Sequence, residues 1–350
     1  MKSEISNKQQ QNGIKAIYNK LWDILFFLLI FPSIIASFFL VKSVKGFRHK
    51  LKQLDKGSHL RDFSDLKLCI PILSVTLIIK IVCENTLVCF TRKIVSMKYP
   101  RPDTEEKKLE NEKIAIKLAQ HIFKGTYYFL ISVFAFFVLK DCDFFPIYIG
   151  GNGSLKNTYK PGYPDSFYFP RPKYFDLHYL ICLSYSLADL IYLLFIYEKQ
   201  TDFLNMLLHH ICTITLILYS FITNLSNIGS VVLLIHNVTD VAVHITRFGI
   251  RAKFPEIFLI VTGIILILVF IYLRLFIFGE CIYTLVAGYY KWDDGWTTGF
   301  LVLFLCCLYL LHVNWTLRLL EKAYQKIRGN KITDTTSFKK AQELKEKKKE

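Results

Sequence analysis

The chain has few acidic residues, and it lacks the short motifs of several protein classes. Its 350 residues include 28 Asp and Glu against 44 Lys and Arg. The nine cysteines contain no CxxC pair, which disfavours a cysteine metal site. The nine histidines contain one adjacent pair and no HxxxH box, so the histidine clusters of a membrane di-iron enzyme are missing. The first 20 residues are too polar for a cleavable signal peptide.

Long apolar segments dominate what is present. Hydrophobic residues make up 53% of the chain, and the mean hydropathy is +0.33. The runs Leu21–Val41, Ile257–Phe278 and Thr298–Leu317 are each long enough to cross a hydrocarbon core of about 30 Å. They are continuous and do not alternate, as the strands of a barrel would. We therefore predict an all-α fold, a polytopic transmembrane helical bundle.

Eight spans are expected, and the positive charges set their orientation. The spans lie near residues 22–41, 68–90, 122–139, 175–197, 203–223, 227–246, 256–279 and 298–319. An even number puts both termini on one side, and the Lys-rich tail places that side in the cytosol. The same rule explains the net charge of +16, so we expect no nucleic-acid partner. Loops 140–174 and 280–297 should be lumenal, which leaves a Cys142–Cys281 disulfide open.

Residues 202–247 are the most informative stretch, because two predicted spans joined by a polar turn contain ionisable side chains. His209 lies 15 residues before Asn224, and Asp240 lies 16 residues after it. At about 1.5 Å per helical residue, the two side chains would lie at the same depth in an antiparallel hairpin. Ionisable groups in hydrocarbon are costly and mark functional sites. An imidazole level with a carboxylate predicts a nucleophile or general base with its orienting partner.

Further polar residues fall at the same depth. His236 precedes Asp240 by four residues and shares its helix face, and Thr213 should lie opposite His236. Interhelical polar contacts could explain any one of these residues alone. A single zinc ion held by His236, Asp240 and His244 is another reading. We favour a catalytic site without a metal, because several polar side chains share one depth.

Other polar residues in the spans fit structural roles better. Three histidines belong to no such group, and we interpret them as structural: His121, His178 and His312. Lys80 and Glu84 are four residues apart within one span, so they can neutralise each other.

The pattern resembles the core motif of ceramide synthases, within the TLC-domain family. The resemblance rests on Asp202-Phe203, Met206, His209-His210, Thr213, Gly229 and the segment from His236 to Asp240. Weaker similarity extends outward to Asp65-Leu66, Pro71, Lys80, Glu84, the stretches 117–128 and 174–197, and Leu311-His312-x-x-Trp315. One departure is Asn237, where ceramide synthases usually have Asp; Asn cannot act as a base.

The resemblance implies a division of the chain. Residues 1–64 would hold a cytosolic segment, an additional N-terminal helix and a basic loop. Residues 65–325 would form the TLC-type membrane domain. Residues 326–350 would be a basic, disordered cytosolic tail. The closing Lys347-Lys348-Lys349-Glu350 resembles a dilysine retrieval signal and, with the family, suggests the endoplasmic reticulum membrane.

The resemblance also implies a function: transfer of a fatty acyl group from acyl-CoA to a sphingoid base, giving ceramide or dihydroceramide. His209 would accept the acyl group or act as a general base, and Asp240 would orient it. His210 and His236 would complete the catalytic set. Substrate-binding candidates are Asn237, Thr213, Arg247, Arg251, Lys253 and Trp315.

No cofactor is expected, because acyl-CoA is a substrate. The expected partners are acyl-CoA, the sphingoid base and membrane lipids, with a homodimer or an accessory subunit left open. The alternative is a TLC-family membrane protein that binds, senses or chaperones lipid and catalyses nothing.

Overall fold

A computed structural model describes residues 63–158, 172–197, 203–223, 225–289 and 295–328. Within these residues the chain is helical, with no β-strand. Seven helices are long and apolar enough to cross a membrane. The all-α polytopic bundle is therefore confirmed. The predicted span at 22–41, the basic loop after it and most of the predicted tail lie outside the described residues.

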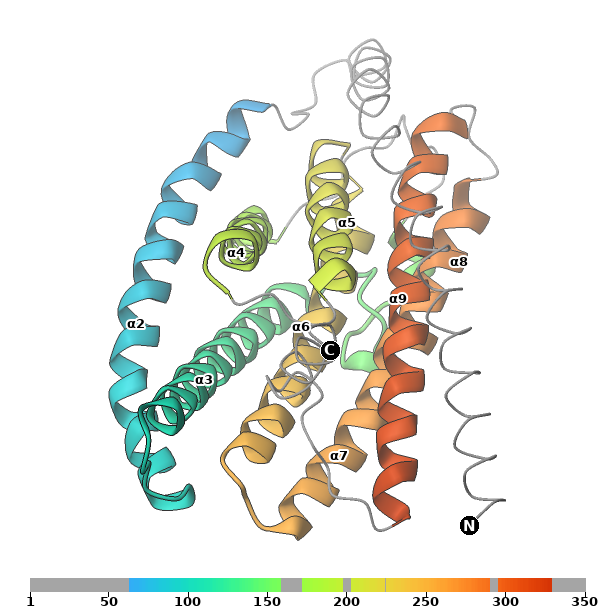
Figure 1. The fold of residues 1–350 in the computed structure, drawn as a ribbon. Helices are drawn as coiled ribbons and strands as arrows, with labels where there is room; N and C mark the ends of the chain where they lie inside the picture. Colours follow the sequence, from blue (N-terminus) through green and yellow to red (C-terminus); the bar gives the residue numbers. More distant parts are fainter. Residues whose placement is uncertain (1–62, 159–171, 198–202, 224, 290–294, 329–350) are drawn as a thin grey trace, which may run out of the picture.

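Figure 1 shows the arrangement of the helices. In chain order they are η1 (Phe63–Leu68), α2 (Cys69–Lys98), α3 (Glu105–Leu139), η2 (Ile147–Ile149), η3 (Leu155–Thr158), α4 (Phe175–Phe195), α5 (Phe203–Ile222), α6 (Ser226–Arg251), α7 (Glu256–Phe270), η4 (Ile271–Ile277), α8 (Phe278–Tyr289) and α9 (Gly295–Ile327). Helices α7, η4 and α8 are continuous, and Glu256–Ala287 forms one span.

Burial separates inner helices from outer ones. In the most apolar 18-residue stretch of α4 and of α5, 56% of the residues are buried. The corresponding share is 11% for Ser64–Lys98 and 17% for Glu256–Ala287. Both spans expose many Ile, Leu, Val and Phe side chains, which suits contact with lipid tails. Helices α4 and α5 therefore form the centre of the bundle.

The predicted hairpin is present, but its arms diverge. Helix α5 ends at Ile222 and α6 begins at Ser226, so the connection is short, as predicted. Helix α5 then packs mainly against α4 and α9, whereas α6 packs mainly against α3 and α7. Because the two arms do not pack along their whole length, space remains between them inside the bundle.

Several helices are longer than the sequence predicts. Helix α3 begins at Glu105 rather than near 122, and the side chain of Thr104 caps it by accepting a hydrogen bond from Lys107 N at 3.3 Å. Polar helix-forming residues extend α3 beyond the apolar segment on which the prediction relied. The predicted lumenal loop 280–297 is also largely helical, because α8 continues to Tyr289 and α9 begins at Gly295.

The segment that follows α3 folds back into the bundle. Phe144, Phe145 and Leu155 are buried, and η3 packs against α6 and α8. Cys142 and Cys281 are free thiols, so the disulfide left open by the sequence is not formed. Burial raises the pKa of the Cys142 thiol to about 11, which keeps it protonated and unreactive at neutral pH.

Gly229 lets α4 approach α6 closely. A Cβ atom at this position would lie 1.9 Å from the Tyr179 hydroxyl and 3.1 Å from Ser220 Oγ. These two oxygens are 2.6 Å apart and hydrogen-bonded. Tyr179 is 1% exposed and packs against the rings of Phe175 and Phe221, so moving it aside would disturb these contacts. The glycine is needed for this close contact.

We expect Gly229→Ala to destabilise the protein, because overpacking of this kind costs about 1–3 kcal/mol. Gly263→Ala is the matched control, since nothing lies within 4 Å of a Cβ at that helical position. Thermal unfolding in detergent should show a lower midpoint for Gly229→Ala and an unchanged or higher midpoint for Gly263→Ala. Equal midpoints for the two variants would contradict the close contact at Gly229.

Candidate active site

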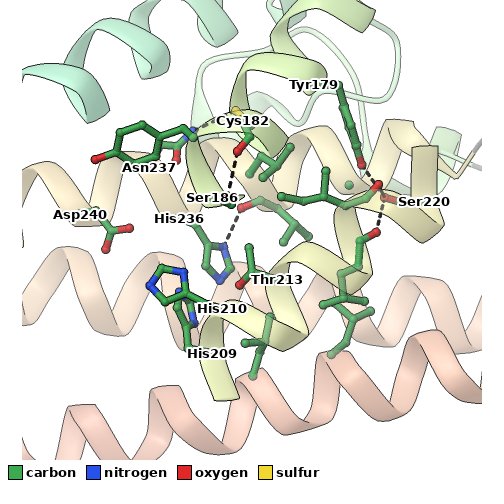
Figure 2. Close-up of a pocket in the computed structure, with 18 of the residues that line it drawn as sticks. Tyr179, Cys182, Ser186, His209, His210, Thr213, Ser220, His236, Asn237 and Asp240 are labelled. Carbon is green, nitrogen blue, oxygen red and sulfur yellow. Dashed lines mark hydrogen bonds between the residues drawn. The ribbon is translucent and has the colours of Figure 1, made fainter. Parts of the chain in front are cut away.

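A cavity lies where the arms of the α5–α6 hairpin diverge. Its empty volume is about 950 Å³. Figure 2 shows the polar residues gathered toward one end and the Tyr179–Ser220 pair at the other. Residues from six helices line it: Tyr127, Tyr128, Tyr179, Cys182, Tyr185, Ser186, Asp189, His209, His210, Thr213, Leu216, Ile217, Ser220, Ile228, Gly229, Val232, Leu233, His236, Asn237, Asp240, Cys281, Leu301, Leu305 and Leu308.

Six of the ten residues predicted for the site line this one cavity. They are His209, His210, Thr213, His236, Asn237 and Asp240. In the structure, side chains from both arms of the hairpin therefore come together, as counting residues from the turn predicted. The other four candidates, Arg247, Arg251, Lys253 and Trp315, lie outside the lining.

The direct pairing of His209 with Asp240 is not formed, and this corrects the sequence-based prediction. Asp240 Oδ1 instead accepts a hydrogen bond from Arg274 Nη2 at 2.7 Å. Nδ1 of His209 is buried without a hydrogen-bond partner. The guanidinium of Arg274 is 2% exposed, and a buried cation needs a carboxylate more strongly than a neutral imidazole does.

Sequence reasoning missed Arg274, although a signal was present. It is the single charged residue within the apolar run Ile257–Phe278, and an ionisable residue inside a span is a candidate functional residue. It lies in η4, which is a π-helical turn. Such turns are frequent at functional sites, because they redirect a side chain without ending the helix.

Arg274 also fixes the surrounding histidines. It donates through Nη1 to His312 Nε2 at 3.0 Å and through Nη2 to the carbonyl of His236 at 3.0 Å. His312 therefore carries its proton on Nδ1. His236 donates from Nδ1 to the Val232 carbonyl at 2.6 Å, which leaves its Nε2 unprotonated. His312, predicted to be structural, packs directly behind the site, with its ring centroid 4.9 Å from that of His236.

His210 faces a second carboxylate that sequence reasoning did not single out. Its Nε2 lies 3.7 Å from Asp189 Oδ2 in α4. Asp189 also binds Lys124 at 2.7 Å and Lys80 at 3.0 Å. The predicted pair of Lys80 and Glu84 is formed at 3.4 Å. Asp189 in the predicted span 175–197 and Lys124 in the predicted span 122–139 are charged residues inside apolar segments. This placement could have marked both as candidate site residues.

Trp315 supports His209 rather than lining the cavity. Its ring centroid lies 5.4 Å from that of His209, in an edge-on arrangement. Asn237 lines the cavity, and its Nδ2 donates to Cys182 Sγ at 3.9 Å. The amide therefore makes a weak contact in place of the ionic one that an Asp would make.

The predicted basic residues lie at and just beyond the C-terminal end of α6. Arg247 and Lys253 are exposed. Lys253 Nζ lies 3.6 Å from the centre of the Tyr99 ring, and the Tyr99 hydroxyl donates to the Arg251 carbonyl at 2.6 Å. Arg247 follows Asp240 by seven residues, which is about 10 Å along the helix. These cations are thus close to the cavity without being part of it.

The end of the cavity far from the histidines is apolar and closed by aromatic rings. The Tyr179 ring lies 6.1 Å from Phe175 and 5.9 Å from Phe221, centroid to centroid. Its hydroxyl is bound to Ser220, which also donates to the Leu216 carbonyl at 2.6 Å. Leu216, Leu233 and Leu305 line the walls. In the part of the chain that the structure describes, no group of three or more His, Cys, Asp or Glu side chains is placed to hold a metal ion.

This fold and site define a multi-pass membrane protein with a histidine-lined cavity in its core. A family model for the TLC domain matches residues 117–321, more than half of the chain. The chain therefore belongs to the TLC-domain family.

The relatives it resembles are ceramide synthases. It is 24% identical to ceramide synthase hyl-2 of Caenorhabditis elegans over 270 residues, which cover 74% of this chain and 78% of that protein. It is 33% identical to ceramide synthase 4 of Mus musculus over 163 residues, which cover 45% of this chain and 40% of that protein. It is 27% identical to human ceramide synthase 5 over 168 residues, again 40% of that protein's length. The resemblance noted in the sequence is confirmed.

The Arg274–Asp240 pair is testable by a double-mutant cycle. Arg274→Met should cost about 3–5 kcal/mol of stability, because it leaves a buried carboxylate unpaired. Adding Asp240→Asn removes that charge and should restore part of the loss. Thermal unfolding of the single and double variants in detergent measures both effects. A double variant no more stable than Arg274→Met would show that the two charges do not depend on each other.

Proposed function

We propose that this protein is a ceramide synthase that transfers a fatty acyl group from acyl-CoA to the amine of a sphingoid base. One observation carries the proposal: a TLC-domain chain places three histidines and two carboxylates at one end of a cavity that is otherwise largely apolar. A long acyl chain needs the apolar part, and acyl transfer needs the imidazoles. The relatives named ceramide synthase support the same reaction.

In this proposal His209 accepts the acyl group. An imidazole nitrogen of His209 attacks the thioester carbon, the carbon–sulfur bond breaks, and the leaving thiolate takes the imidazole proton to give free coenzyme A. The sphingoid amine then attacks the acyl-imidazole, and the amide is released. Trp315 packs edge-on against the His209 ring and restricts its movement.

Asp240 acts together with Arg274. Asp240 Oδ1 accepts from Arg274, which also donates to His312 and to the His236 carbonyl, so the pair holds the histidine end of the cavity in place. The cation keeps Asp240 ionised within the bilayer. Exposed Arg247 and Lys253 would hold the phosphates of the coenzyme at the cytosolic edge. The family and the basic tail fit the endoplasmic reticulum membrane.

His209→Ala should abolish ceramide formation from acyl-CoA and sphinganine in microsomes of cells without their own enzyme. Mass spectrometry of the purified protein after incubation with acyl-CoA should find an acyl adduct on His209. His121→Asn is the control, because His121 bonds to His244 and does not line the cavity. Normal activity of His209→Ala would disprove the role given to this residue. A wild-type protein that binds acyl chains without making product would support the non-catalytic alternative.

The Tyr179–Ser220 pair should set the length of the acyl chain. Ser220 is 11 residues from His209, or about 16 Å along α5. At about 1.25 Å per carbon of an extended chain, this holds about 13 carbons beyond the carbonyl. Tyr179→Ala opens about 5 Å and should move the preferred acyl-CoA toward longer chains by about four carbons. Tyr179→Phe keeps the ring and should keep the preference. An unchanged profile for Tyr179→Ala would place the limit elsewhere.

A further inference from the structure

A buried charged cluster lies beside the cavity, and the acylation step does not use it. Its members are Lys80 and Glu84 of α2, Lys124 of α3 and Asp189 of α4. Lys80 is 0% exposed and Asp189 is 4% exposed. Four charges inside a bilayer are costly, and such groups mark functional sites. The two cations and two anions balance, but charge balance alone does not require Asp189 to line the cavity.

Asp189 differs from the rest of the cluster because it lines the cavity. Its Oδ2 lies 3.7 Å from Nε2 of His210. The other carboxylate in the described lining, Asp240, is bound to Arg274. Adjacent residues on a helix point about 100° apart, so His209 packs on Trp315 while His210 turns toward α4. The two neighbouring imidazoles therefore have different partners.

The proposed reaction releases one proton that needs an acceptor. A primary amine such as that of a sphingoid base is an ammonium ion at neutral pH, because its pKa is near that of Lys, about 10.4. The thiolate of coenzyme A takes the imidazole proton in the first step. In the second step the ammonium must lose a proton before its nitrogen can attack the acyl carbon. The second proton of the amine returns to His209 as the carbon–nitrogen bond to His209 breaks.

Resting on the proposed function, we propose that His210 is the base that takes the first proton from the sphingoid ammonium. Asp189 positions His210 and stabilises its imidazolium form. The ring centroids of His209 and His210 are 5.6 Å apart, so the acceptor lies next to the acylated imidazole. The ligand assigned to this side of the cavity is a long-chain primary ammonium.

The charges around Asp189 suit this role. Lys80 and Lys124 keep Asp189 ionised, and together with Glu84 the four groups sum to zero. Because the cluster is neutral overall, His210 can gain a proton without adding to an existing excess of positive charge. The titratable groups that face Asp189 from the packed elements are Lys80 and Glu84 of α2, Lys124, Tyr127 and Tyr128 of α3, Tyr185 and Tyr192 of α4, the following Tyr197, His209 and His210 of α5, and Asp240 and His244 of α6.

The test separates the two half-reactions in the full-length protein. Asp189→Asn should form the acyl-enzyme from acyl-CoA at the wild-type rate, as followed by release of coenzyme A in a single turnover. Transfer to sphinganine at neutral pH should fall about 100-fold, the usual contribution of a positioned base. Hydroxylamine, which is uncharged at neutral pH, should discharge the acyl-enzyme of the variant as fast as that of the wild type.

A pH profile gives a readout that a purely structural role would not change. Between about pH 7 and pH 9 the free-amine fraction of sphinganine rises about 100-fold, so transfer by Asp189→Asn should recover over this range. His210→Gln leaves the charges of the cluster intact and should show the same slow transfer to sphinganine. It tests the role of His210 if Asp189→Asn does not fold. His121→Asn is the control, since His121 bonds to His244 outside the cluster and does not line the cavity, and both steps should be unchanged.

Equal slowing of both half-reactions in Asp189→Asn and His210→Gln would overturn this role. So would slow discharge by hydroxylamine, or the same defect in His121→Asn. A wild-type protein that forms no acyl-enzyme would instead overturn the proposed function itself. The two failures are therefore distinguishable in one set of measurements.

Discussion

The cost of an unpaired charge in hydrocarbon is the constraint on which the core of this molecule depends. Buried Arg274 forms an ion pair with Asp240, and Asp189 and Glu84 neutralise Lys80 and Lys124. The pairs of Asp240 and of Asp189 join different helices, so they hold the bundle together as well as neutralising charge. The pairs also keep two carboxylates ionised where a neutral acid would otherwise be favoured. The chemistry of the cavity follows from this arrangement.

The two ion-pair groups divide the cavity between them. Asp240 and Arg274 lie on the side formed by α6 and η4, and Asp189 with its lysines lies on the side formed by α2, α3 and α4. The adjacent histidines of α5 stand between these sides. One short sequence, His209-His210, can therefore serve two steps of a reaction, because helical geometry turns its two rings toward different surroundings.

Much of this was predictable from the sequence, for identifiable reasons. Long apolar runs gave the spans, and counting residues from the turn brought His209, His236 and Asp240 to one cavity. The partner of Asp240 was not predictable by counting, because Arg274 lies in a π-helical segment and the counting assumed regular α-helices. The role of Asp189 was not predictable either, because it depends on a contact with His210 that crosses between helices. Helix ends were missed where polar residues continue the helix, as at Glu105.

The π-helical turn Ile271–Ile277 also affects everything that follows it. Accommodating one additional residue in a helical turn changes the phase of the later side chains by about 100°. Leu268 of α7 is 63% exposed, whereas Phe278, Cys281 and Leu285 of α8 are fully buried. Leu266 and Phe270 of α7 are also buried, so the span keeps a buried face on both sides of the π-helical turn. The number of residues between Glu256 and Ala287 is therefore constrained, because the loss of one residue would rotate the packing face of α8 toward the lipid.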